Sequence, residues 1–300
     1  MKINSSTGDI ALTAIAPAIW GSTYLVTTEF LPPGYPLTVA MLRALPAGLI
    51  LLLLVRQLPF GIWWRRSFIL GALNFSFFWA MLFISAYRLP GGVAATVGAI
   101  QPLIVVLLAR SLIGTQVKPL AIVAALIGMA GVGLLVLTPS AALDPIGVIA
   151  GLAGAVSMAF GTVLTRRWAP PVSSLTVTAW QLTAGGLLLL PVALLLEPAP
   201  PVPTMANILG MAWLGLIGAA FTAVLWFRGI ARIGPAIVAP LGFLSPLVAT
   251  LLGWGVLDQN LSPLQTVGMV TVLASVWLGQ RAQMAPRPAA PVTAMPATGR

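Results

Sequence analysis

The chain is a succession of apolar runs, each roughly twenty residues long, separated by short segments rich in proline, glycine and charged residues. Polar and apolar residues do not alternate within the runs, as they would in the strands of a membrane β-barrel. About twenty apolar residues in an α-helix cross the hydrocarbon core of a bilayer, so each run predicts one membrane-spanning helix. We place such helices at residues 10–28, 36–55, 67–87, 92–112, 119–137, 145–164, 174–195, 206–226, 235–257 and 263–280.

The composition indicates the same class of protein. Apolar residues make up 59% of the chain and charged residues only 7%, whereas a soluble domain carries about 25% charged residues. We therefore expect an all-α integral membrane protein with ten transmembrane helices. The absence of Cys and His excludes a disulfide, a His-activated nucleophile and the usual zinc, haem and iron–sulfur sites. We accordingly expect no cofactor and no metal.

The distribution of charge predicts the orientation of the chain in the membrane. Of the 15 basic residues, all but Arg43 and Arg88 fall on one side of the successive spans. Basic residues favour the cytoplasmic side, so both termini are expected there. The net charge of +10 does not indicate nucleic-acid binding, because the basic residues are scattered between apolar blocks. Residues 284–300, rich in Pro and Ala, predict a disordered cytoplasmic tail.

The second half of the sequence repeats the first. A shift of 144 residues superimposes Arg88 on Arg232 and Pro102 on Pro246, and a slightly smaller shift matches earlier helices. Each half holds an odd number of predicted spans, so residues 8–138 and 145–282 are expected to form two inverted five-helix repeats. Such repeats are typical of transporters that expose a central site to each side in turn. A gene duplication without alternating access would leave the same pattern.

Two prolines near the middle of their spans predict irregular helices. A proline inside a helix removes a hydrogen bond and crowds the carbonyl four residues earlier, which here belongs to a glycine in both spans. Irregular backbone at this depth is tolerated where it is buried or lines a cavity. A packing kink is the alternative interpretation. The candidate helix-break or gating positions are Gly98, Pro102, Gly242 and Pro246.

Arg43 is the one charge well inside a predicted span, and its counterpart in the second half is Gln181. A cation at the centre of a membrane helix costs about 2.5–3.5 kcal/mol on insertion scales, so it should face the interior and bind a carbonyl or a substrate carboxylate. A side chain that extends to the interface is the alternative. Midspan aromatic and polar residues suit a flat apolar or aromatic substrate, although single rings also pack in cores or face lipid. The candidate substrate-binding residues are Trp20, Tyr24, Arg43, Asn74, Phe78, Trp79, Gln101, Trp180, Gln181 and Ser245.

The order and spacing of several motifs resemble the drug/metabolite transporter superfamily, EamA type, over about residues 8–282. These motifs are Trp20-Gly21-Ser22, the buried arginine, the two midspan prolines and the segment 257–262 before a final helix of small residues. The family commonly has an acidic residue at the position of Asp258, but its first-half equivalent here is Gly114. Within the superfamily, the aromatic content and short length look like those of bacterial exporters of aromatic amino acids.

The resemblance implies a multi-pass transporter of the bacterial inner membrane that exports amino acids, or similar small metabolites, from a central cavity by alternating access. The expected partners are a small-molecule substrate and the lipid bilayer; the oligomeric state is open and compatible with a monomer. The alternatives are an exporter of drugs or nucleotide-sugar-like metabolites and, in another class, an intramembrane enzyme. A nucleotide-sugar carrier should have a basic pocket for the phosphates, and a single buried arginine supplies little positive charge for one. An intramembrane enzyme is disfavoured because the sequence has no His, no Cys and no midspan carboxylate to build an active site.

The positions of the acidic residues bear on energy coupling. A proton-coupled carrier needs a titratable group in the substrate path, but the 5 acids fall in predicted loops or at span ends. We therefore expect transport down the substrate gradient, or driven by the membrane potential for a charged substrate. Glu29 and Asp9 are the two acids that a tilted helix would bring into the cavity.

The predicted topology can be tested with reporter fusions. Reporters placed after Arg167 and after Arg300 should both report a cytoplasmic location, and one placed between Ala141 and Pro145 should report a periplasmic location. A cytoplasmic signal from the third fusion would contradict the inverted repeat.

Overall fold

The computed structural model describes residues 5–89, 97–136, 144–258 and 262–284, and every regular element among them is a helix. The elements are α1 (Ser5–Phe30), α2 (Pro36–Val55), α3 (Trp63–Gly71), η1 (Ala72–Ser76), α4 (Phe77–Arg88), α6 (Gln101–Ile113), α7 (Pro119–Val136), α8 (Pro145–Trp168), α9 (Ser174–Leu196), α10 (Met205–Ala212), η2 (Trp213–Phe221), α11 (Thr222–Ile233), α12 (Pro235–Val238), η3 (Ala239–Phe243), α13 (Leu244–Val256) and α14 (Pro263–Met284).

Seven of the described helical stretches are long and apolar enough to cross a membrane, which confirms the prediction of a multi-span helical protein. The runs expected at 92–112 and 119–137 contain the shorter apolar helices α6 and α7, and both runs include residues outside the described part. α14 is long enough to cross, but residues such as Gln265 and Gln280 make it less apolar. The count of ten spans stays a prediction, and the predicted tail lies, apart from Met284, outside the described residues.

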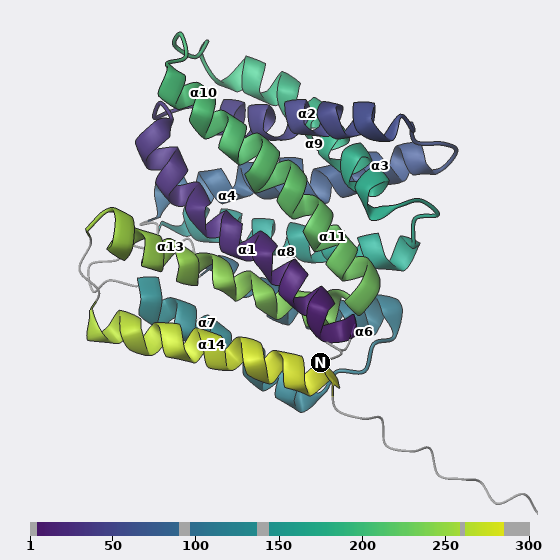
Figure 1. Cartoon of the computed structure of the whole chain (residues 1–300), viewed down its shortest axis with the longest axis vertical. Coiled ribbons are helices and arrows are strands. Elements are labelled where there is room, and N and C mark those ends of the chain that lie inside the picture. Colours follow the sequence, from purple (N-terminus) through teal and green to yellow (C-terminus); the bar gives the residue numbers. More distant parts are fainter. Residues whose placement is uncertain (1–4, 90–96, 137–143, 259–261, 285–300) are drawn as a thin grey trace, which may run out of the picture.

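The helices lie side by side in one bundle, with the α2–α9 pair at one end and the α7–α14 pair at the other (Figure 1). Between these pairs, α1 packs against α11 and α13, while α8 packs against α4 and α6. The largest apolar cluster is rich in alanine and includes the rings of Phe75, Trp79, Trp226 and Phe227. Small residues let helices approach closely, which favours their association in lipid.

Glycines set the close approach of α2 and α9. A Cβ added at Gly48 would lie 2.4 Å from the backbone nitrogen of Thr183, and one added at Gly186 would lie 2.6 Å from the Cα of Leu45. The neighbouring atoms are backbone, so they cannot move aside without separating the helices. These two positions therefore fix how the halves of the chain meet.

A carboxylate joins the same two helices at one end. Glu197 directly follows α9, and its oxygens accept hydrogen bonds from the backbone N–H groups of Leu37 and Thr38 in the first turn of α2, both at 2.7 Å. The first N–H groups of a helix have no partner within it and carry partial positive charge, so an anion placed there is stabilised. Glu197 thus holds α2, the helix that carries Arg43, against α9.

Three irregular helical segments interrupt the bundle. η1 and η2 are π-helical, a form that often occurs at functional sites, and η3 is a 3₁₀-helix. Pro102 and Pro246, the predicted positions of irregular helix, each lie in the first turn of an α-helix, where proline is tolerated because its position needs no hydrogen-bond donor. The irregular backbone precedes them, as a turn at 99–100 and as η3.

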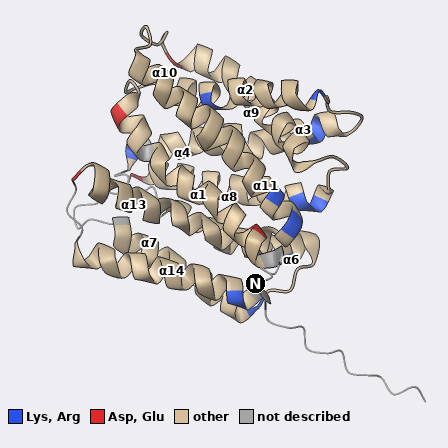
Figure 2. Cartoon of the chain, in the orientation of Figure 1, with Lys and Arg blue, Asp and Glu red and all other residues tan. Residues whose placement is uncertain are grey.

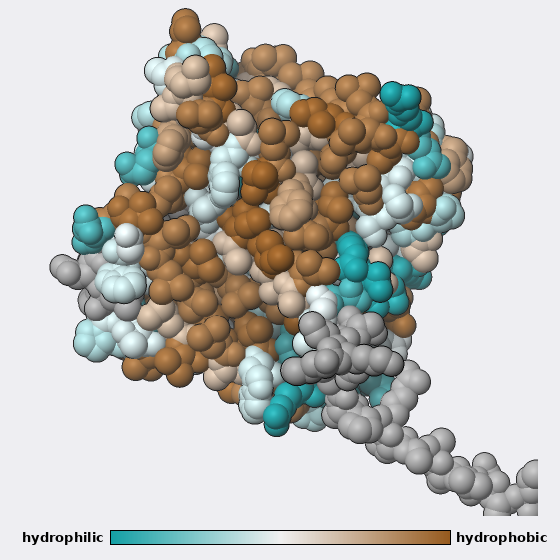
Figure 3. All heavy atoms as spheres, in the orientation of Figure 1, coloured by the Kyte–Doolittle hydropathy of each residue, from teal (hydrophilic) through white to brown (hydrophobic). Residues whose placement is uncertain are grey.

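Charge separates to opposite edges of the bundle, and apolar residues cover the face between them (Figures 2 and 3). We call the edge with most of the Lys and Arg the basic edge; it includes the arginines that end α8, α11 and α14. The opposite, acidic edge includes Glu29, Asp144 and Glu197, at or beside the ends of α1, α8 and α9. This arrangement matches a helical bundle that spans a bilayer between two aqueous sides.

Asp144 at the acidic edge caps α8. Its Oδ1 accepts hydrogen bonds from the backbone N–H of Ile146 at 2.8 Å and of Gly147 at 3.0 Å, and Arg88 lies 3.3 Å from its Oδ2. The hydrogen bond from Gly147, followed by those from Ile146 and Arg88, lowers the pKa of this carboxyl group below its ordinary value. The cap is therefore fully present above the ordinary Asp pKa and is lost as the pH falls through the lowered pKa.

Replacing Gly48 by leucine should separate α2 from α9. Overpacking a tight contact costs about 1–3 kcal/mol, and here the clash is with backbone. We expect a lower melting temperature and loss of monodispersity in detergent, measured by thermal unfolding and size-exclusion chromatography. Gly255→Leu is the matched control, because a Cβ at exposed Gly255 meets no atom within 4 Å. Equal damage by both substitutions would contradict the account of this contact.

Candidate functional site

The guanidinium of Arg43 on α2 is buried between α2, η2 and α4. The residue is 7% exposed, its Nη2 donates a hydrogen bond to the carbonyl of Gly218 at 2.8 Å, and its Cζ lies 4.9 Å from the ring centroid of Trp79. Its Nε is buried without a hydrogen-bond partner, and no carboxylate of the described residues forms an ion pair with it. Among the described residues, a carbonyl dipole and the face of an aromatic ring thus compensate the charge.

The carbonyl that receives Arg43 belongs to the π-helix η2, and a second side chain also binds it. Thr222 Oγ1 donates to the carbonyl of Gly218 at 2.9 Å and accepts a hydrogen bond from Trp20 Nε1 at 2.9 Å. The ring of Trp226 lies 5.0 Å from that of Trp20, and its Nε1 is buried without a partner. Helices α1, α2 and α11 therefore meet at one irregular turn.

A pair of buried amides joins η1 to α9. Asn74, in the π-helix η1, donates through Nδ2 to Gln181 Oε1 at 2.7 Å and approaches Thr165 Oγ1 at 3.4 Å. Asn74 is 1% exposed and Gln181 is fully buried. Asn74 Oδ1 and Gln181 Nε2 have no partner, so the pair retains one free acceptor and one free donor.

A cavity of about 440 Å³ opens at the basic edge, between the end of α8, the start of α9 and α11. Its lining residues are Thr165, Arg166, Ala169, Pro170, Val172, Ser174, Val177, Phe227 and Ala231. The volume falls within the range of about 300–1,000 Å³ that is typical of small-molecule pockets. Thr165, which lines the cavity, also contacts Asn74, so one lining residue connects the cavity wall to the buried amide pair.

Residues 7–137 and 145–279 both match the model of the EamA-like transporter family. The chain belongs to the EamA-like transporter family. Protein PecM of Dickeya dadantii (strain 3937) is 48% identical over 267 residues, which cover 88% of this chain and 90% of PecM. The inner membrane transporter YedA of Escherichia coli (strain K12) is 30% identical, over 87% of this chain and 86% of YedA. A solved structure at 21% identity has a TM-score of 0.80 over 92% of this chain and 97% of its own, which shows the fold.

The match confirms the resemblance to the EamA type, and this multi-pass membrane protein is a transporter. Its bundle brings several of the candidate site residues together. Trp20, Arg43 and Trp79 are joined through η2 and ring contacts, and Asn74 and Gln181 bond each other. Phe78 is partly buried against the same apolar cluster.

Other candidates lie elsewhere in the transporter. Trp180 is buried, but its Nε1 donates to the carbonyl of Gln57 at 2.7 Å and its ring packs against Phe60 and Trp63, near the loop after α2. Because neighbouring residues of a helix point in different directions, Trp180 and Gln181 face different surroundings. The remaining candidates lie beside the helix breaks or on α1, where the side chain of Tyr24 is outside the described part; those beside the breaks are Gly98, Gln101, Pro102, Gly242, Ser245 and Pro246.

Three residues that the sequence pattern did not single out adjoin the site: Thr165, Thr222 and Phe227. Threonine and phenylalanine are common in membrane helices, so nothing in one sequence marks them. Their role becomes visible only when η1, α8 and α11 are placed together.

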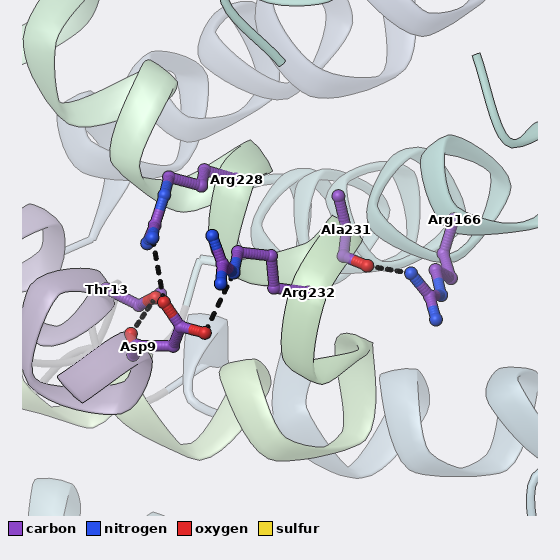
Figure 4. A network of polar contacts seen from close by, with 6 residues as sticks. All are labelled: Asp9, Thr13, Arg166, Arg228, Ala231 and Arg232. Carbon is purple, nitrogen blue, oxygen red and sulfur yellow. Dashed lines mark hydrogen bonds and ion pairs between the residues drawn. The ribbon is translucent and has the colours of Figure 1, made fainter. Parts of the chain in front are cut away.

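Asp9 forms a buried ionic cluster at the basic edge (Figure 4). It is 7% exposed and pairs with Arg228 Nη2 at 2.8 Å and Arg232 Nε at 2.9 Å, which joins α1 to α11. The sequence correctly placed Asp9 at the end of a span, but the paired arginines had been assigned to a loop. They lie instead within the last turns of α11.

Asp9→Asn should loosen α1 from α11. Removing one partner of a buried ion pair is strongly destabilising, but the arginines here are partly exposed, so we expect about 1–2 kcal/mol. Thermal unfolding in detergent measures the effect. Glu29→Gln, at the exposed end of the same helix, is the control and should leave the melting temperature unchanged. Equal stability of Asp9→Asn and the parent would contradict the cluster.

Proposed function

We propose that this EamA-like transporter exports amino acids, above all aromatic or other apolar ones, or similar small metabolites, across a bacterial inner membrane. Arg43 carries the proposal, because it is a buried cation with an unpaired Nε and no ion pair to the described carboxylates. A substrate carboxylate would supply the missing anion, since guanidinium and carboxylate groups match in geometry. The rings of Trp20 and Trp79 would receive an apolar side chain.

The second part of the proposal is that residues 8–138 and 145–282 form inverted repeats of five spans each and work by alternating access. The helix contacts support it: α1 packs against α11 and α13 as α8 packs against α4 and α6. The pairs α2–α9 and α7–α14 each join helices in equivalent positions. A two-fold axis in the membrane plane would produce this pattern.

Polar contacts inside the bundle follow the same relation. Arg43 on α2 reaches Gly218 in η2, while Gln181, its counterpart on α9, bonds Asn74 in η1. Asn74 and Gly218 are 144 residues apart, the same shift that relates the matched arginines of the two halves. We infer that one ancestral contact between two helices became a cation site in one half and an amide pair in the other.

Two ion pairs at the edges support the relation further. Asp9, near the start of α1, pairs with Arg232 near the end of α11. Asp144, at the start of α8, pairs with Arg88 at the end of α4. The first pair lies at the basic edge and the second at the acidic edge, as inversion requires.

We infer that the basic edge faces the cytoplasm, because positively charged segments are retained on that side. α1 begins and α14 ends at this edge (Figure 1), so both termini would be cytoplasmic. The cavity between α8, α9 and α11 also opens there. The structure would then represent a state open toward the cytoplasm.

The proposal includes transport without proton coupling. Asp9 pairs with two arginines, Asp144 caps α8 and Glu197 caps α2. Glu29 is exposed at the end of α1, and Asp258 lies in an exposed turn after α13. None of these described acids bonds to Arg43 or to the Asn74–Gln181 pair. A substrate gradient, or the membrane potential for a charged substrate, would therefore drive transport.

Efflux from liposomes tests the substrate class. The purified protein should release labelled phenylalanine, tryptophan or leucine faster than protein-free liposomes. Arg43→Gln should reduce the rate about a hundredfold, because a buried charge contact is lost. Leu195→Ala, at an 82% exposed position on α9, is the control and should transport normally. Transport of neutral compounds lacking a carboxylate at the same rate, or full activity of Arg43→Gln, would overturn the assignment.

An imposed pH gradient tests energy coupling. With the membrane potential clamped, substrate should equilibrate across the liposome membrane and not accumulate. Uphill accumulation driven by the pH gradient alone would contradict the proposal. Glu29→Gln and Asp9→Asn would then identify the proton-carrying group by abolishing that accumulation.

A further inference from the structure

The cavity at the basic edge has exposed and buried lining residues. Arg166, Ala169 and Ala231 at its rim are exposed, whereas Thr165, Val177 and Phe227 at its inner end are buried, with exposed fractions of 5%, 4% and 2%. Residues of α8, α9 and α11 therefore line a cavity that extends from the exposed edge to buried residues of the bundle. Its inner end adjoins the buried site without including Arg43.

The lining combines one cation with an apolar wall. Arg166 lies in the last turn of α8 and donates through Nη1 to the carbonyl of Ala231, as drawn in Figure 4. It forms no ion pair with a described carboxylate, so its charge is available to an anion. The hydroxyls of Thr165 and Ser174 are the other polar side-chain groups of the lining, and most of the remaining wall is aliphatic or aromatic.

The charges around the mouth favour an anion. Asp9 offsets part of the charge of Arg228 and Arg232, while Arg166 and Arg167 remain without an acidic partner among the described residues. α9 also begins at the cavity, where Ser174 is its first residue, and a helix start carries partial positive charge. Clefts lined by one sign of charge raise the local concentration of the opposite ion.

Aromatic rings connect the cavity to the central cation. Phe227 at its inner end lies 6.1 Å from Phe75, and Phe75 lies 5.3 Å from Trp79, measured between ring centroids. Trp79 in turn lies under Arg43. A ligand in the cavity is therefore separated from Arg43 by side chains, and these belong to the two helices with π-helical segments.

We propose that this cavity is a loading site, which binds a carboxylate-bearing apolar substrate before the substrate reaches Arg43. Arg166 contacts the carboxylate, the aliphatic wall contacts the substrate body, and Phe227 closes the inner end. The inference takes the substrate class from the proposed function. It adds a second binding position to the one at Arg43. The two positions are distinguishable because each has its own arginine.

The chain has no cysteine, so a single thiol can report occupancy of the cavity. Ser174→Cys in the full-length purified protein should react with a water-soluble thiol reagent, and L-phenylalanine should slow that reaction. 2-Phenylethylamine, which has the same ring and amine but no carboxylate, should not. Pro171→Cys, exposed in the adjoining loop and outside the lining, is the control and should react equally with and without phenylalanine.

Charge variants identify the contact. In the Ser174→Cys background, Arg166→Gln should raise the phenylalanine concentration for half-protection about tenfold, as expected for loss of a charge-assisted hydrogen bond. Arg166→Lys should retain most of the protection. Arg167→Gln is the matched control, because it removes the same charge from the next residue, which does not line the cavity. Equal effects of the two glutamine variants would overturn the proposed role of Arg166.

Arg43→Gln, combined with Ser174→Cys, separates the loading site from the central site. Protection of the introduced thiol should persist in this double variant although transport is lost, because the cavity does not contain Arg43. Loss of protection would mean that phenylalanine acts only from the central site, and the loading site would be wrong. If the Ser174→Cys protein transports phenylalanine but phenylalanine does not protect the thiol, the loading site alone is overturned. If the protein neither binds nor transports phenylalanine, the proposed function is overturned as well.

Discussion

The rest of the structure depends on a positive charge enclosed within the bundle. A cation at this depth is costly unless dipoles or anions compensate it. Arg43 receives one carbonyl and one aromatic face from the protein and keeps an unpaired Nε. The packing of α2 on α9 and the cap that Glu197 provides hold this charge in place. An anionic substrate group would complete a site that the described protein leaves incomplete.

The irregular helices explain how the interior becomes polar without charged partners. A regular helix uses its carbonyl groups in its own hydrogen-bond ladder, whereas the Gly218 carbonyl in the π-helix η2 accepts a hydrogen bond from Arg43 on another helix. η1 likewise presents Asn74 to Gln181. η1 carries Phe75, and the helices that follow η1 and η2 carry Trp79 and Phe227, the other rings between the cavity and Arg43. A change in one of these helical turns would therefore move both the surroundings of Arg43 and the rings that separate it from the cavity. The membrane-spanning bundle thus contains its least regular backbone where its polar groups meet.

Much of this organisation could be predicted from the sequence. Apolar runs predicted the helices, and the charge bias predicted a basic and an acidic edge. The position of Arg43 inside a predicted span predicted that its charge is buried in the bundle. Periodicity could not predict that Pro102 and Pro246 lie in the first turns of α6 and α13, because the preceding irregular turns depend on packing against other helices. Nor could it show that Trp180 faces the loop after α2 while Gln181 faces Asn74, since adjacent residues share one hydropathy window. The pairing of Asp9 with α11 depends on contacts between residues more than 200 positions apart.

A structure of the protein bound to phenylalanine tests the central claim most directly. The distance to measure is the one between the substrate carboxylate oxygens and the guanidinium nitrogens of Arg43. The account predicts a hydrogen-bonded pair at about 2.7–2.9 Å, with the ring of the substrate beside Trp20 or Trp79. A bound substrate in the central region whose carboxylate contacts other groups, with Arg43 Nε still unpaired, would contradict it.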